Sequence, residues 1–140
     1  MLSRTFLWPQ GYTSAAMISV NLDAEFYGRI FYPGIDVSEG DIQRLGWTGM
    51  EYGLPHLLDC FREHGVKGTF FIPGRVAELY PDAVRAIADA GHELGCHGYE
   101  HEILAHFTPE EQLELLKKAK AAIEKAAGRA VTGFRMPEGV

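Results

Sequence analysis

The sequence contains very little cysteine and no long apolar stretch. Cys60 and Cys96 are the only two cysteines among 140 residues. Two are too few for a disulfide framework, and their apolar neighbours predict small buried thiols in a reducing compartment. Residues 1–11 hold one positive charge, no long apolar core and an early Pro9. We therefore expect neither a signal peptide nor a membrane span there, and a cytoplasmic location.

Positive charge is also scarce. The 13 Lys and Arg residues are scattered and are outnumbered by 19 Asp and Glu residues, which gives a formal net charge of −6. Nucleic acids and anionic membranes both require clustered basic residues, so neither is an expected partner. The sequence has no internal repeat, low-complexity tract or linker. Its composition, 46% hydrophobic and 23% charged, predicts one globular domain over residues 1–140.

Short apolar runs alternate with helical patterns. The apolar runs predict buried strands over residues 15–22, 68–72 and 92–96. Residues 132–135 would begin a fourth strand. Apolar periodicity predicts helices over residues 51–64, 81–90 and 108–128. The last helix carries the strongest signal, a Thr108 N-cap with Pro109 at the first position and Glu111 at the third. This alternation predicts an α/β protein with a parallel sheet covered by helices.

The stretch from Phe26 to Met50 fits neither pattern. It contains glycine, proline and aromatic residues without a sustained helical or strand period. Loops of this length inside a compact domain are usually functional, which predicts a lid or a binding loop. The alternative is a surface loop without a binding role, whose aromatic side chains pack on the domain.

A pair of histidines follows the third predicted strand. His97 and His101 are four residues apart, and on one helical turn both rings could face a single ion. A catalytic divalent ion usually takes three protein ligands, and the best candidate for the third lies in the stretch from Ser19 to Glu25, which contains Asp23. The carboxyl ends of parallel strands share one face, so Asp23, Pro73, His97 and Arg135 should converge. Taken singly, the aspartate could cap a turn and the histidines could be core residues.

In chain order, these motifs resemble the polysaccharide deacetylase family (NodB homology, carbohydrate esterase family 4), and most closely its peptidoglycan-deacetylase-like and allantoinase-like branch. The motifs are Asp23, Gly68-Thr69-Phe70-Phe71, Gly91-His92-Glu93 with His97-x-x-x-His101, and Gly133-Phe134-Arg135-x-Pro137. The resemblance covers almost the whole chain. It implies the N-terminal part of a distorted (β/α) barrel, usually of seven strands.

The resemblance also implies a site and a reaction. Asp23, His97 and His101 match the ligands of a divalent metal, most often zinc. The family hydrolyses acetamido or other C–N amide bonds, so the expected substrate is an N-acetylated sugar, a related glycan or a small amide. The leading function is therefore metal-dependent amide hydrolysis. The alternatives are a catalytically impaired, metal-containing binding domain and an inactive, truncated fragment of a longer deacetylase.

One departure from the family concerns the general base. The family normally has an aspartate two residues before the ligand aspartate, and this chain has Asn21, whose amide cannot take a proton at neutral pH. Glu25 or Glu138 could serve as the base instead. In the family, the arginine at the position of Arg135 normally pairs with that aspartate. Here Arg135 would face a neutral partner and could instead orient a substrate anion.

A second departure concerns length. The family's later motifs, including a general-acid histidine, have no counterpart before Val140, so we expect a truncated domain. Among the other histidines, only His106 is near enough to the metal pair in sequence to be a candidate. An incomplete barrel leaves an unpaired strand edge and uncovered apolar helix faces, which predicts a homo-oligomer with a contribution from the 26–50 stretch.

Overall fold

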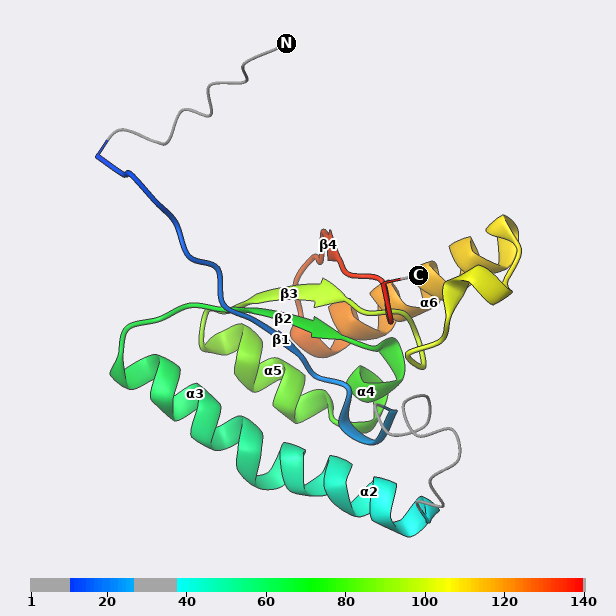
Figure 1. Ribbon diagram of the computed structural model, residues 1–140, viewed down its shortest axis with the longest axis horizontal. Coiled ribbons are helices and arrows are strands. Elements are labelled where there is room, and N and C mark those ends of the chain that lie inside the picture. The colour runs from blue at the N-terminus through cyan, green and yellow to red at the C-terminus, as the bar shows by residue number, and fades with distance from the viewer. Residues whose placement is uncertain (1–10, 27–37, 140) are drawn as a thin grey trace.

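Four parallel strands form the centre of the molecule. The computed structural model describes residues 11–26 and 38–139. The strands are β1 (Ser19–Asn21), β2 (Thr69–Ile72), β3 (Glu93–Cys96) and β4 (Gly133–Phe134), paired in the order β1-β2-β3-β4 (Figure 1). All three pairings are parallel. The predicted α/β class and parallel sheet are therefore confirmed.

Helices occupy each connection between neighbouring strands. Helix α2 (Glu39–Thr48), the π-helix η2 (Gly49–Gly53) and α3 (Leu54–Glu63) follow one another without a break before β2. Helices α4 (Gly74–Leu79) and α5 (Pro81–Asp89) precede β3, and α6 (Pro109–Ala127) precedes β4. Two short 3-10 turns, η1 (Ala24–Phe26) and η3 (Leu104–His106), complete the described elements. The helices lie on one side of the sheet (Figure 1). Within the described part of the chain, no helix is long and apolar enough to cross a membrane.

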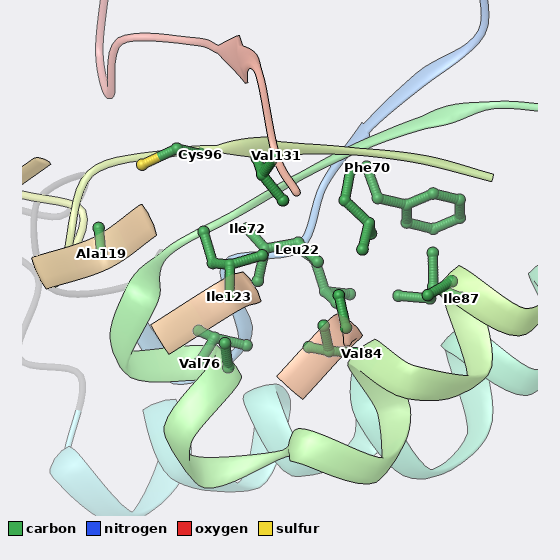
Figure 2. Close-up of a cluster of buried hydrophobic side chains, with 14 of the residues drawn as sticks. Leu22, Phe70, Ile72, Val76, Val84, Ile87, Cys96, Ala119, Ile123 and Val131 are labelled. Carbon is green, nitrogen blue, oxygen red and sulfur yellow. The ribbon is translucent and has the colours of Figure 1, made fainter. Parts of the chain in front are cut away.

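The core lies between the sheet and these helices. Phe70 and Ile72 point from β2 toward Val84 and Ile87 of α5 and Val76 of α4 (Figure 2). None of these five side chains is exposed to solvent. Burial of one such side chain contributes about 1.5–3 kcal/mol to the stability of the fold. This free energy fixes which face of each strand points toward the helices. The alternate strand residues face the other side of the sheet.

The start of α6 has the predicted capping box. The Thr108 hydroxyl accepts a hydrogen bond from the Glu111 backbone N–H, and the Glu111 carboxylate accepts one from the Thr108 N–H at 2.8 Å. Pro109 occupies the first helical position. Gly128, with φ of 68°, ends the helix in the left-handed conformation. The predicted start and end of this helix are therefore confirmed.

Two sequence predictions of burial are wrong, one for a strand and one for a cysteine. The apolar run 15–22 forms a strand only over β1, and residues 11–18 are exposed. Among the described strands, β1 lies at the edge of the sheet and pairs with β2 alone. Cys60 is exposed, because it lies on the solvent side of the amphipathic helix α3, whose Leu54 and Phe61 are buried. Cys96 is buried in β3, as expected.

The prediction of an irregular stretch from Phe26 to Met50 is wrong for its second half. Helix α2 begins after Ser38, whose hydroxyl accepts a hydrogen bond from the Asp41 N–H at 3.2 Å. Residues 27–37 lie outside the described part of the chain. The helical period is hidden in the sequence because α2 buries only Gly46, a residue that normally weakens helices.

Gly46 has a packing role. A Cβ atom at this position would lie 2.7 Å from the Glu25 Cα and closer still to the Glu25 nitrogen. Real Cβ atoms do not approach backbone atoms so closely, so glycine lets α2 rest directly on the η1 turn. That turn starts one residue after Asp23. A helix, rather than a loop, therefore supports the segment that carries this aspartate.

Candidate metal centre

Asp23, His97 and His101 lie together at the carboxyl ends of the strands. Asp23 follows β1 by two residues, and His97 follows β3 directly. The His97 Nε2 atom is 3.6 Å from Asp23 Oδ1, and the His101 Nε2 atom is 3.7 Å from Asp23 Oδ2. One ligand atom from each residue lies within 4.8 Å of the other two, and all three residues are buried.

The two histidines do not share a helical turn, contrary to the sequence prediction. Residues 97–101 form a loop, and His101 has a positive φ of 59°. The Glu102 carboxylate holds this loop by accepting hydrogen bonds from the N–H groups of Tyr99, at 2.9 Å, and Glu100, at 2.6 Å. The rings still meet, with centroids 4.9 Å apart. Their spacing in sequence thus indicated proximity but not the local structure.

The first turn of α4 anchors the same loop. The carbonyl groups of Gly98 and Tyr99 accept hydrogen bonds from the N–H groups of Gly74, at 3.0 Å, and Arg75, at 2.8 Å. The buried Tyr99 ring extends to α4, where its hydroxyl donates to Glu78 at 3.0 Å. The histidine loop is therefore fixed to the connection that follows β2.

The surroundings keep both imidazoles in the form that binds metals. The His97 Nδ1 atom lies 2.8 Å from the Arg135 carbonyl oxygen. A carbonyl oxygen only accepts, so Nδ1 carries the proton and Nε2 presents its lone pair toward Asp23. Burial is the main influence on the pKa of His97 and of His101, and it lowers both. Both rings are therefore neutral near pH 7, as metal coordination requires.

The carboxylate of Asp23 lacks the partners that a buried charge needs. Burial, and secondly the negative charge of Glu138, raise the Asp23 pKa to about 6. Within the described residues, Asp23 Oδ1 and His97 Nε2 are buried without a hydrogen-bond partner. Such atoms are costly unless something satisfies them. Ligands about 2.1 Å from a tetrahedral zinc ion lie about 3.4 Å apart, close to the two distances from the Asp23 oxygens to the histidine nitrogens, so the residue types and their grouping fit one divalent ion.

Arg135 and Asn21 meet on the sheet face that the helices leave uncovered. The guanidinium of Arg135 donates to Asn21 Oδ1 at 2.7 Å and to Ser19 Oγ at 2.8 Å. Its central carbon lies 4.0 Å from the centre of the Phe71 ring. Arg135 thus links the end of β4 to β1 across the sheet. Ser19 was missed in the sequence, although its position two residues before Asn21 on a strand places both on one face.

The remaining sequence candidates lie at different distances from the cluster. Glu25 accepts a hydrogen bond from the Tyr80 hydroxyl at 3.3 Å and lines a hollow of about 450 Å³ with Trp47. Glu138 Oε1 lies 3.5 Å from His101 Nδ1. His106 is exposed at the end of η3. Of these three side chains, the one that we find within 4 Å of a cluster side chain is Glu138, which faces His101.

Strained backbone is concentrated around the cluster. Among the described residues, the non-glycine residues with positive φ are Ala24 at 47°, His101 at 59° and Glu138 at 60°. Ala24 follows Asp23 directly, and the other two are members or neighbours of the cluster. Such conformations cost about 1–3 kcal/mol each and persist where the surrounding structure fixes them, often at functional sites.

The fold and the cluster together define a class: an α/β domain whose parallel sheet carries one aspartate and two histidines, able to hold a metal ion, at the carboxyl ends of its strands. The family model for polysaccharide deacetylase matches residues 46–140, about two thirds of the chain. The chain belongs to the polysaccharide deacetylase family.

Individual proteins with similar sequences and structures support this family assignment. A peptidoglycan deacetylase from Helicobacter pylori is 38% identical over 106 residues, which are 76% of this chain and 36% of that protein. The structure of a Mycobacterium smegmatis protein described as a polysaccharide deacetylase matches with a TM-score of 0.83 at 34% identity, over 94% of this chain and 46% of that one. The predicted family and partial barrel-type fold are therefore confirmed.

A third relative is described as a pseudoenzyme. It is a CE4 family pseudoenzyme from Bacillus anthracis, with a TM-score of 0.65 and 27% identity over 88% of this chain and 35% of that one. A mutant of the same protein is described as having restored enzymatic activity. This chain spans less than half the length of each of the three relatives.

Proposed function

We propose that this chain carries the metal site of a deacetylase that hydrolyses the acetamido C–N bond of an N-acetylated glycan such as peptidoglycan. In this proposal, Asp23, His97 and His101 hold one divalent ion, and that ion is zinc. The observation that supports this most strongly is the buried cluster itself, in which a carboxylate oxygen and an imidazole nitrogen have no hydrogen-bond partner among the residues that the structure describes. The glycan class rests on the peptidoglycan deacetylases among the relatives.

A bound ion would polarise the substrate carbonyl and lower the pKa of a water molecule toward about 7. The chain's own residues supply orientation. The Arg135 guanidinium donates a hydrogen bond to the side-chain Oδ1 of Asn21, and the Asn21 amide N–H groups remain to donate to a ligand in the hollow of about 380 Å³ that Asn21 and Asp23 line. Asn21 can therefore donate to a substrate acceptor but cannot take a proton from water.

The proposal therefore places the general base on another carboxylate. Glu25 is the sequence candidate that lines the neighbouring hollow, where the Tyr80 hydroxyl holds one of its oxygens. A carboxylate there would take a proton only from a water molecule that reaches it within about 3 Å, or through one further water. In the proposal, Glu25 acts from this hollow, and Arg135 contributes positive charge for an anionic part of the substrate.

A second candidate is a metal-containing binding domain without turnover. Two observations favour it: Asn21 stands where the family has its general base, and one relative is described as a pseudoenzyme. This candidate keeps the same metal ligands. It differs only in whether the bound glycan is hydrolysed.

Acetate release from N-acetylglucosamine oligomers, measured with and without added zinc, separates the two candidates. The hydrolase proposal predicts zinc-dependent release that His97→Ala abolishes. A positioned base contributes about 10²–10⁴-fold, so Asn21→Asp should raise the rate if a missing base limits it, whereas Asn21→Ala should not. If the zinc-loaded wild type shows no turnover and zinc-loaded Asn21→Asp does, the result would favour the binding domain. Zinc-loaded protein that is inactive in every form would refute the hydrolase proposal.

A further inference from the structure

We propose that Glu138 is a positioning residue of this metal centre: its carboxylate accepts a hydrogen bond from the Nδ1–H group of His101 and so keeps the Nε2 lone pair directed toward the ion. The inference rests on the proposed function, because it takes Asp23, His97 and His101 as ligands.

The two imidazoles are arranged in the same way. Each turns Nε2 toward Asp23, at 3.6 Å and 3.7 Å. Each turns Nδ1 toward the segment that follows β4. For His97 the partner is the Arg135 carbonyl oxygen at 2.8 Å, and for His101 it is Glu138 Oε1 at 3.5 Å. One short segment, residues 135–138, therefore faces the outer nitrogen of both histidines.

The contact between His101 and Glu138 is buried. His101 is 3% exposed and the Glu138 side chain is 13% exposed. Within the described residues, neither His101 Nδ1 nor Glu138 Oε1 has a hydrogen-bond partner, although they face one another. A donor and an acceptor left side by side in a buried site satisfy both of their needs by a small movement of either side chain.

This partner matters because a neutral imidazole carries only one N–H. The partner of one ring nitrogen decides which nitrogen keeps the proton, and a carboxylate in this role also raises the basicity of the other nitrogen. Without an acceptor at Nδ1, His101 would divide between two tautomers. The tautomer with the proton on Nε2 cannot coordinate a metal through Nε2, the nitrogen that faces Asp23.

The position of Glu138 separates it from the ligands. It contacts the nitrogen of His101 that points away from Asp23, and it does not belong to the group whose ligand atoms lie within 4.8 Å of one another. Its charge nevertheless fits the site. Asp23 and Glu138 together supply two negative charges beside two neutral imidazoles, which balances a divalent cation.

The test compares Glu138→Ala and Glu138→Gln with the wild type. Long-range proton–nitrogen NMR of the metal-free protein at pH 7.5 reports the tautomer of His101, and competition with a chromophoric chelator reports zinc affinity. Loss of such a partner typically costs about 10–100-fold in affinity. We expect that loss and a mixed tautomer in Glu138→Ala. Glu138→Gln still offers an oxygen acceptor, so it should keep the Nδ1–H tautomer and most of the affinity.

Two controls isolate the hydrogen bond. His97 keeps its carbonyl partner, so its tautomer should stay the same in every variant. Glu100→Ala removes one exposed negative charge next to His101 and should change zinc affinity much less than Glu138→Ala. Wild-type affinity and an unchanged His101 tautomer in Glu138→Ala would overturn the inference, and so would an equal loss in Glu100→Ala. A wild-type chain that binds no zinc would instead refute the proposed metal site, while the NMR measurement would still test the contact.

Discussion

Replacing Asp23 with asparagine should stabilise the metal-free protein while it removes the metal site. The Asp23 pKa is raised from 3.8 to about 6, first by burial and then by Glu138. A pKa difference of one corresponds to about 1.4 kcal/mol, so this increase means that the buried charge costs about 3 kcal/mol at pH 7. Asparagine has nearly the shape of the protonated aspartate and carries no charge.

The pH dependence gives the sign of the effect. With a raised pKa, the folded protein holds a proton that the unfolded chain has already lost. The contribution of Asp23 to stability is therefore complete below about pH 4 and is lost as the pH rises through about 6. The difference between Asp23→Asn and wild type should be near zero at pH 4 and about 3 kcal/mol in favour of the variant at pH 7.

Urea unfolding of the chelator-treated proteins at several pH values measures this difference. Added zinc should reverse the order at pH 7, because a ligand at 1,000 times its dissociation constant stabilises the protein that binds it by about 4 kcal/mol. If Asp23 were instead a structural turn residue, its loss would destabilise the metal-free protein. A less stable metal-free Asp23→Asn variant at pH 7 would refute the reasoning.

Two further predictions concern packing and assembly. Gly46→Ala should destabilise the protein in urea unfolding and weaken zinc binding, because overpacking against the Glu25 backbone costs about 1–3 kcal/mol, against about 1 kcal/mol gained in helix propensity. Gly53→Ala meets nothing within 4 Å and should be neutral or stabilising, so equal effects would contradict this account. The sheet face that the described helices leave uncovered, with the exposed Phe134 and Met136 nearby, predicts a homo-oligomer in light scattering at low micromolar concentration, and a stable monomer would contradict it.

The sequence predicted those parts of the structure that depend on local signals. Helix α6 was recognised because Thr108 and Glu111 form their capping box within four residues. Strands β2 and β3 were recognised because short apolar runs between turn residues have few other structures available. The grouping of Asp23 with the two histidines followed from strand and helix alternation, which places the carboxyl ends of parallel strands together.

Other features depend on contacts between distant segments. The positive φ of His101 accompanies hydrogen bonds from its loop to Glu102 and to the start of α4, which no spacing rule predicts. Helix α2 was missed because Gly46, which lets it pack on η1, normally disfavours a helix. Glu138 was named only as an alternative base, and its position beside His101 depends on how the chain turns after β4.

The most direct measurement is a zinc titration of the purified, metal-free chain by calorimetry, with elemental analysis of the product. The account predicts about one tightly bound divalent ion per chain. It also predicts loss of tight binding in Asp23→Ala and in His101→Ala, because two remaining ligands rarely hold zinc. Wild-type stoichiometry and affinity in both variants, or no binding by the unaltered chain, would contradict the assignment of these side chains as a metal centre.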